Sequence, residues 1–393
     1  MAEQTKQVYG LQFGLLCLSS FLFFSSFNMI IPELPDYLAS LGGEEYKGLI
    51  ISLFALTAGL SRPFSGKLAD KVGRVPVMVV GSAVCVLAGF LYPLVGTVAA
   101  FLLLRFVHGF STGFTPTGKS AYVADVVPVE RRGEAMGLLG LSGSLGMAAG
   151  PALGGLIAAE YTASMMFYTS SAAAFLSVAV IWHMQETVQN PAKFSWSLFR
   201  ISRQEILEPR VLAPSLVMLF TSFSFGTILT VIPDFSAHLG IENKGLFFTS
   251  FTLSSLAIRF LAGRASDKYG RVAVLRVSSG LLALAMLVIG LVSTDTGLLL
   301  SGVLFGVATG MNSPTIYSWT IDLSHLEHRG RAMATMYIAL EVGIGLGALA
   351  SGWLYGNQSA NFPLAFWVAG AFSLVAFLYL MLVVPGKQTA SAT

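Results

Sequence analysis

Three ionisable side chains lie deep within apolar stretches of this sequence, where a charge is costly and usually serves a function. Glu341 lies about ten residues into its stretch, which is ~15 Å along an α-helix. Burial favours the protonated form of a carboxyl group, so Glu341 is suited to pick up and release a proton. Arg105 and His108 are three residues apart and therefore share one helix face. We predict that Glu341, His108 and Arg105 bind protons or a charged ligand. The alternative is static contacts, in which Glu341 meets a buried hydroxyl or arginine and His108 stays neutral.

Aromatic and amide side chains occur in the same apolar stretches and could line a binding cavity. Such a cavity would suit an amphipathic organic molecule, including a cationic one. The predicted cavity residues are Phe24, Asn28, Phe220, Asn312, Tyr317 and Tyr337.

Motifs of enzymes are weak in this sequence. Gly109-Phe110-Ser111-Thr112-Gly113 has the spacing of a nucleophile elbow, but it lies within an apolar stretch and not in a strand–turn–helix. The sequence shows no cluster of metal ligands, no phosphate-binding loop and no dinucleotide fingerprint. We therefore expect no enzymatic activity, no metal and no cofactor, with a membrane-embedded enzyme as the distant alternative.

The composition shows which elements must position these residues. The chain is 54% hydrophobic and 11% charged, with a mean hydropathy of +0.73, whereas about 25% of residues are charged in soluble domains. About twelve apolar runs are long enough to span a membrane as helices of ~20 residues, and a spanning helix satisfies its own backbone hydrogen bonds. The sequence predicts an all-α membrane protein with 12 transmembrane helices.

An internal repeat divides these helices into two sets. Gly66–Arg74 recurs 197 residues later as Gly263–Arg271, and Asp125 recurs as Asp322 at the same offset. We predict two pseudo-symmetric six-helix bundles, residues 1–184 and 210–393, joined by a cytoplasmic linker, residues 185–209. Parallel repeats in a hydrophobic chain indicate a transporter whose substrate path lies between the halves.

Basic residues are distributed unevenly between the loops. If the amino terminus is cytoplasmic, the outer loops hold only two basic residues, Lys47 and Lys244. This asymmetry predicts cytoplasmic positions for both termini. The net charge of +3 then reflects topology and not binding of nucleic acid. Lys119 lies near an inner helix end, and we expect its long side chain to reach the membrane surface.

Over essentially its whole length the sequence resembles the major facilitator superfamily. The Gly66–Arg74 loop and its copy resemble the signature loop of that family. The fifth helix resembles the antiporter motif at Gly146, Gly150, Pro151, Gly154 and Gly155. Pro32-Glu33-Leu34-Pro35 and Arg105-Phe106-Val107-His108-Gly109 resemble motifs of the twelve-helix drug:proton antiporter group, with His108 where glutamine is commoner. Many members of that group carry an acidic residue midway along the first helix, where this chain has Asn28.

The resemblance implies the major facilitator fold and a conformational latch at the cytoplasmic ends of the helices. Carboxylates beside guanidinium groups would lock the two bundles together there, and breaking these contacts would open that side. The implied latch residues are Gly66, Asp70, Gly73, Arg74, Asp125, Asp267, Arg271 and Asp322. The alternative is that they serve only membrane topology and a tight glycine turn.

Together, these features predict a proton-coupled efflux antiporter of small amphipathic organic molecules, of the multidrug type, that works by rocker-switch alternating access. The alternative is a proton-coupled uptake symporter or facilitator of a small solute. We expect the partners to be a small-molecule substrate, protons and membrane lipid, and the protein to be a monomer in the bacterial inner (plasma) membrane.

Overall fold

The structure of the protein is a computed structural model that describes residues 10–128, 131–195, 198, 207–324 and 329–384. These residues form helices and connecting turns, with no strand in the part of the chain that is described. The long helices are α2 (Leu11–Ile30), α4 (Lys47–Lys71), α5 (Arg74–Leu91), α6 (Val98–Val126), α7 (Arg132–Glu160), α8 (Ala163–Trp182), α9 (Leu212–His238), α10 (Gly245–Tyr269), α11 (Arg271–Ile289), α12 (Asp295–Leu323), α13 (Arg329–Tyr355) and α14 (Phe362–Leu382).

These helices have the length and apolar character of membrane spans. Among the described residues, eleven qualify directly, and the number rises to twelve when the two straight parts of α10, Gly245–Arg259 and Leu261–Tyr269, count as one bent span. The predicted all-α membrane architecture is therefore confirmed. The physical reason is that only a helix can satisfy the backbone of such long apolar stretches within one segment.

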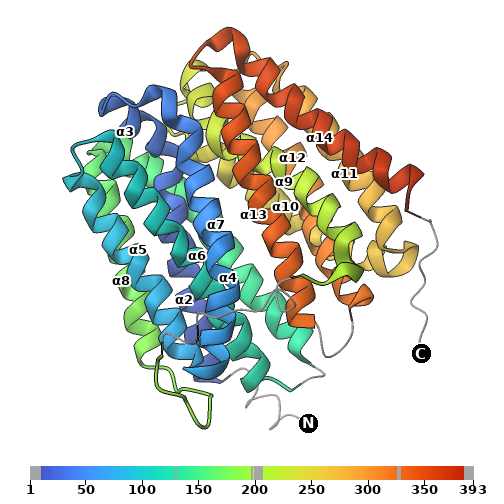
Figure 1. Cartoon of the computed structure of the whole chain (residues 1–393). Coiled ribbons are helices and arrows are strands. Elements are labelled where there is room, and N and C mark those ends of the chain that lie inside the picture. The colour runs from blue at the N-terminus through green and yellow to red at the C-terminus, as the bar shows by residue number, and fades with distance from the viewer. Residues whose placement is uncertain (1–9, 129–130, 196–197, 199–206, 325–328, 385–393) are drawn as a thin grey trace. The chain divides into compact units, whose positions relative to one another are not determined.

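The chain packs into two compact units. One contains residues 1–33 and 57–201, and the other contains residues 34–56 and 202–393. Figure 1 shows the helices of the first unit mostly in blue to green and those of the second mostly in yellow to red. Helix α4 belongs to both, because its first ten residues pack with the second unit. The two bundles predicted from the sequence repeat have different boundaries from these two packed units. The predicted boundaries at residues 184 and 210 stay a prediction.

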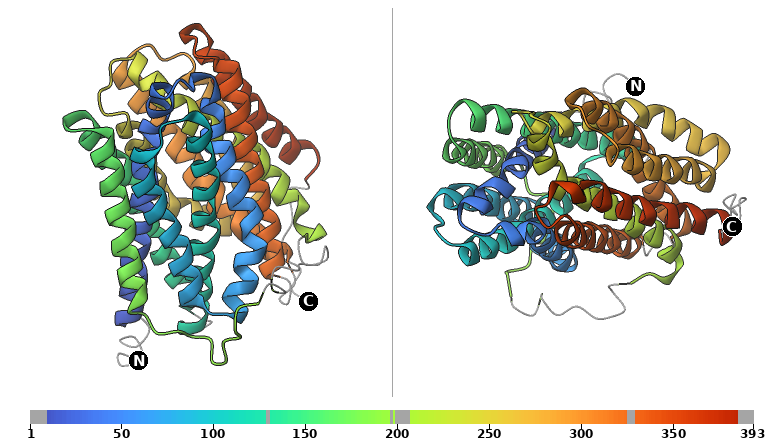
Figure 2. Two further views of the ribbon diagram at one scale, coloured as in Figure 1. Left: turned by 60° about the vertical axis from the view of Figure 1, so that its left-hand side comes forward. Right: turned by 90° about the horizontal axis from the view of Figure 1, so that it is seen from above.

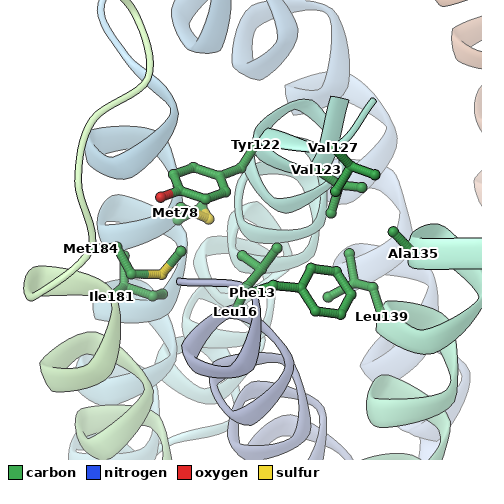
Figure 3. Close-up of a cluster of buried hydrophobic side chains, with 10 residues drawn as sticks. All are labelled: Phe13, Leu16, Met78, Tyr122, Val123, Val127, Ala135, Leu139, Ile181 and Met184. Atoms are coloured by element: carbon green, nitrogen blue, oxygen red, sulfur yellow. The ribbon is translucent and has the colours of Figure 1, made fainter. Parts of the chain in front are cut away.

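The first unit has an apolar core near the start of α2 and the end of α6. Figure 3 shows the side chains of five helices meeting there. Phe13 and Leu16 come from α2, Met78 from α5, Tyr122 from α6 and Leu139 from α7. This core includes Met78 near the start of α5, where the first of the two motif loops ends.

The second unit repeats this core at equivalent positions. Leu275 replaces Met78, Trp319 replaces Tyr122 and Met336 replaces Leu139, each 197 residues later. In both views of Figure 2 the long helices of each unit run side by side. The repeat in the sequence is therefore a repeat in packing, because equivalent residues fill equivalent places.

Candidate functional site

The predicted latch residues form two ion clusters, one in each unit. In the first, Arg74 begins α5, and its Nη1 lies 2.5 Å from Oδ1 of Asp70, while its Nε lies 3.0 Å from Oδ2 of Asp125. A guanidinium group can bind two carboxylates in this way because its donors point in fixed, different directions. We call these three residues the first ion cluster.

The second ion cluster repeats the first. Nη1 of Arg271 lies 2.5 Å from Oδ1 of Asp267, and its Nε lies 2.9 Å from Oδ2 of Asp322. Each cluster joins three helices of its own unit: α4, α5 and α6 in one, α10, α11 and α12 in the other. A lock between the bundles stays a prediction.

Glycine is required in the two tight turns beside these clusters. Gly73 has φ of 143° and Gly270 has φ of 91°, values that side chains with a Cβ rarely adopt. A Cβ on Gly73 would also meet the carboxylate of Glu186. Gly66 differs, because a Cβ there would meet nothing within 4 Å.

Glu186 is a residue that the sequence analysis missed. Its two carboxylate oxygens accept hydrogen bonds from the backbone N–H groups of Arg74 and Val75, each at 3.0 Å. A carboxylate in this position satisfies free donors at the start of α5 and interacts favourably with its dipole. The neighbouring Thr187 donates a hydrogen bond of 2.5 Å to Asp125. The repeat could not reveal Glu186, because the equivalent residue of the second half is Val383.

The glycines of the antiporter motif pack α7 directly onto α2. A Cβ on Gly146, Gly150 or Gly154 would meet a backbone carbonyl of α2. Such a row of small residues lets two helix backbones come close together. Gly155 and Pro151 are also buried, and Pro151 lies inside the helix.

Arg105 and His108 lie together in a buried polar cluster of the first unit. Nη1 of Arg105 lies 3.3 Å from the hydroxyl of Tyr92 and 3.4 Å from Nδ1 of His108. The Tyr92 hydroxyl is 3.2 Å from the same ring nitrogen, and Nε2 of His108 is 3.3 Å from the sulfur of Cys85. Tyr92 and Cys85 were not predicted, because helical spacing on one chain segment does not show which residues of other helices approach.

The neighbours of His108 select one tautomer. A guanidinium group only donates, so Nδ1 of His108 accepts from Arg105. The proton of the neutral ring then lies on Nε2, which faces Cys85. This geometry suits a neutral imidazole that orients Arg105.

The expectation for Lys119 is wrong. Its side chain is only 1% exposed, and its Nζ has no hydrogen-bond partner among the described residues. The ammonium group lies 5.1 Å from the centre of the Phe23 ring. The side chain points into the first unit, so it does not reach the membrane surface as long basic side chains near helix ends usually do.

The second unit brings several other predicted residues together. Phe220, Tyr317 and Tyr337 pack against the same apolar core, and the two tyrosine rings have centroids 5.8 Å apart. Glu341 is buried, at 9% exposure, and lies one helical turn beyond Tyr337 on α13. Tyr337 and Glu341 thus place an aromatic ring and a carboxyl group on one face of α13.

The two predicted amide residues use their Nδ2 atoms for contacts within their own units. Asn28 donates to the backbone carbonyl of Phe24 at 2.8 Å. Asn312 on α12 donates to Ser278 and Ser279 of α11, at 3.1 and 3.3 Å. Their places in a substrate cavity stay a prediction.

Two further ion pairs lie at the opposite ends of α4 and α10 from the ion clusters. Nζ of Lys47 is 2.6 Å from Oδ2 of Asp234, and Lys244 forms an ion pair with Asp36. Both pairs lie within the second unit. Lys47 and Lys244 are equivalent in the repeat, and each pairs with an aspartate that follows the apolar part of α2 or α9. We call these contacts the outer ion pairs, after their predicted side of the membrane.

Comparison with known proteins gives one consistent family. The sequence model described as Major Facilitator Superfamily matches residues 16–242 and 214–393. The multi-drug resistance efflux pump PmrA of Streptococcus pneumoniae is 31% identical over 313 residues, which cover 76% of this chain and 77% of that protein. A PmrA homolog of Lactococcus lactis is 28% identical over 349 residues, or 85% of this chain and 86% of that protein. The crystal structure of a D-xylose-proton symporter has the same fold, with a TM-score of 0.77, 17% identity and coverage of 96% of this chain and 99% of that one.

Proposed function

Since the chain belongs to the Major Facilitator Superfamily, we propose that it is a proton-coupled antiporter that exports small amphipathic organic molecules. The observation that carries this proposal is the similarity, over three quarters of the chain, to proteins named multi-drug resistance efflux pumps. The sequence predicted that the chain belongs to this family and that it is a transporter and not an enzyme. Both predictions are confirmed. Proton coupling, direction and mechanism belong to the proposal.

Alternating access is supported by the charged contacts at both ends of two helices. Helices α4 and α10 each have 25 residues, or a length of ~37 Å at 1.5 Å per residue. Each helix ends beside an ion cluster and begins beside an outer ion pair. We propose that the outer ion pairs stabilise one state of a rocker switch, in which the bundles of residues 1–184 and 210–393 move against each other, and that the ion clusters hold the helix ends within each bundle.

Glu341 is the proposed proton carrier. It is a buried acidic residue in the middle of a span, where an ionisable side chain usually serves a function. Arg105 and His108 supply the fixed positive charge and its orienting partner in the other half. The proposed substrate contacts are those predicted from the sequence, among which Phe220, Tyr317 and Tyr337 pack against one core. A proton on Glu341 and a bound substrate would then exclude each other, which is the requirement for exchange.

Helix α7 is the proposed site of bending during exchange. Pro151 removes one backbone hydrogen bond and allows a bend, while the glycines on either side keep α7 against α2. The excess of basic residues in alternate loops supports cytoplasmic positions for both termini. The bacterial sources of the similar efflux pumps support a bacterial plasma membrane protein. The proposed working form is a monomer.

The test uses the full chain in proteoliposomes with an imposed pH gradient and ethidium as the transported probe. We expect Glu341→Gln to reduce gradient-driven ethidium transport at least about tenfold, because an amide cannot carry the proton. Exchange of ethidium without a gradient should also weaken in this variant, because the neutral amide resembles the protonated form that excludes the substrate. Glu160→Gln, at the exposed end of α7, is the control.

Two outcomes would contradict the proposal. Wild-type rates in the Glu341→Gln variant would exclude this residue as the proton carrier. Movement of ethidium in the same direction as protons, followed through reversal of the gradient, would indicate a symporter in place of an antiporter.

A further inference from the structure

Buried charge in the first unit is entirely basic. Arg105 and Lys119 are each 1% exposed, and no aspartate or glutamate is buried in the described part of that unit. In the second unit, by contrast, the buried charges of Asp234 and Lys244 are held in ion pairs. In the described part of the first unit, the buried basic side chains are therefore not matched by buried acidic ones.

Lys119 is the clearest case. Its Nζ lacks a hydrogen-bond partner in the part of the chain that is described, and its contact is with the face of the Phe23 ring. An aromatic ring compensates a buried Lys side chain poorly, because an ammonium group normally needs a counter-charge and three hydrogen bonds.

The fold does not require a charge at this position. The equivalent residue of the second half is Ile316, which is fully buried in an apolar core. Arg105 likewise corresponds to Gly302, and His108 to Phe305. The same scaffold thus packs well with apolar residues at all three places, so the basic residues of the first half serve something other than packing.

The three residues are arranged along one helix face. His108 and Lys119 are 11 residues apart on α6, which is close to three full turns and ~16 Å. Arg105 lies three residues before His108 and contacts it. Lys119 is nearer than Arg105 to the predicted cytoplasmic end of α6.

We propose that Lys119 binds the carboxylate group of an organic anion and that the exported substrates include amphipathic carboxylates. This inference rests on the proposed export function and specifies its substrate class. The ammonium group would donate hydrogen bonds to the carboxylate oxygens, and the Phe23 ring beside it would contact the apolar body of the ligand. Arg105 adds a second positive charge farther along the same helix face.

The experiment compares two ligands of the same shape and different charge. Binding of 2-naphthoate and of neutral 2-naphthamide to the purified full chain in detergent at pH 7 is measured by isothermal titration calorimetry. We expect wild-type protein to prefer the carboxylate. In Lys119→Met, naphthoate binding should weaken about 10- to 100-fold, the loss typical of a hydrogen bond to a charged group, while naphthamide binding stays the same. Lys119→Arg should retain the preference for naphthoate.

The controls separate this inference from the proposed function. Lys71→Met removes an exposed lysine at the end of α4 and should leave the preference for naphthoate intact. Thermal unfolding checks that Lys119→Met is folded, and an excess of sodium sulfate checks for a site that takes any anion.

Three results would overturn the inference: equal naphthoate binding by Lys119→Met and the wild type, no naphthoate binding by the wild type, or displacement of naphthoate by sulfate. Gradient-driven ethidium export by the wild type is measured separately, so its absence would refute the antiport proposal while leaving a Lys119-dependent carboxylate site in place.

Discussion

Replacement of Gly150 by alanine tests whether α7 lies as close to α2 as the structure shows. A Cβ on Gly150 would meet the carbonyl oxygen and Cα of Ser25 and the backbone nitrogen of Met29. All three are backbone atoms, which cannot rotate away as a flexible side chain could. The two helices must therefore move apart or the local packing must distort, and overpacking of this kind costs about 1–3 kcal/mol.

Gly140 on the same helix provides the matched control. A Cβ there would meet nothing within 4 Å. Both substitutions gain the same helix propensity, about 1 kcal/mol for glycine to alanine. The propensity gain cancels in the comparison, so Gly150→Ala should be less stable than Gly140→Ala by about 1–3 kcal/mol.

Thermal unfolding of the two purified variants and the wild type in one detergent measures this difference. For soluble domains of moderate size, 1 kcal/mol corresponds to about 2–4 °C in Tm, so we expect Gly150→Ala to unfold several degrees below Gly140→Ala. Gly140→Ala should equal or exceed the wild type. If Gly150→Ala unfolds at the same temperature as Gly140→Ala or above it, α7 and α2 are not in the close contact described here.

Two further predictions concern polar contacts of the second unit. Asp234→Asn should lower the free energy of unfolding by about 3–5 kcal/mol, because it leaves the largely buried ammonium group of Lys47 without its counter-charge. The double variant that exchanges the two residues, Lys47→Asp with Asp234→Lys, should recover much of the lost stability in thermal unfolding. If it recovers none, Lys47 and Asp234 do not form this pair. Asn312→Ala should lower the free energy of unfolding by about 1–3 kcal/mol, because it removes the amide that donates hydrogen bonds to Ser278 and Ser279. Unchanged stability together with weaker ethidium binding would show instead that the amide serves only the substrate.

The repeat explains why the ion clusters were predictable from the sequence. Asp70, Arg74 and Asp125 recur together at one offset, and the turn between α4 and α5 is short, so few arrangements could bring Arg74 near any other carboxylate. Glu186 was not predictable in the same way. It comes from the linker, its counterpart in the second half is not acidic, and its contact depends on where the chain runs after α8.

Lys119 shows where a rule based on sequence position fails. Distance from a helix end suggests that a lysine can reach the surface, but the direction of the side chain depends on which helices surround it. Helix α2 contributes Phe23 beside α6, and Lys119 is buried against its ring. The partners of Arg105 and His108 were missed for the same reason, because Tyr92 and Cys85 lie on other elements.

The sequence by itself determined the membrane-spanning helices, the twofold repeat and the residues of the motif loops. These follow from local properties, because an apolar run of sufficient length must form a helix in lipid and a repeated segment must repeat its contacts. Only the tertiary structure decided which side chains meet: that α7 presses on the backbone of α2, that His108 accepts from Arg105, and that Lys119 is buried. Those contacts depend on how each helix is rotated about its axis, and packing between helices sets that rotation, which no single apolar segment encodes.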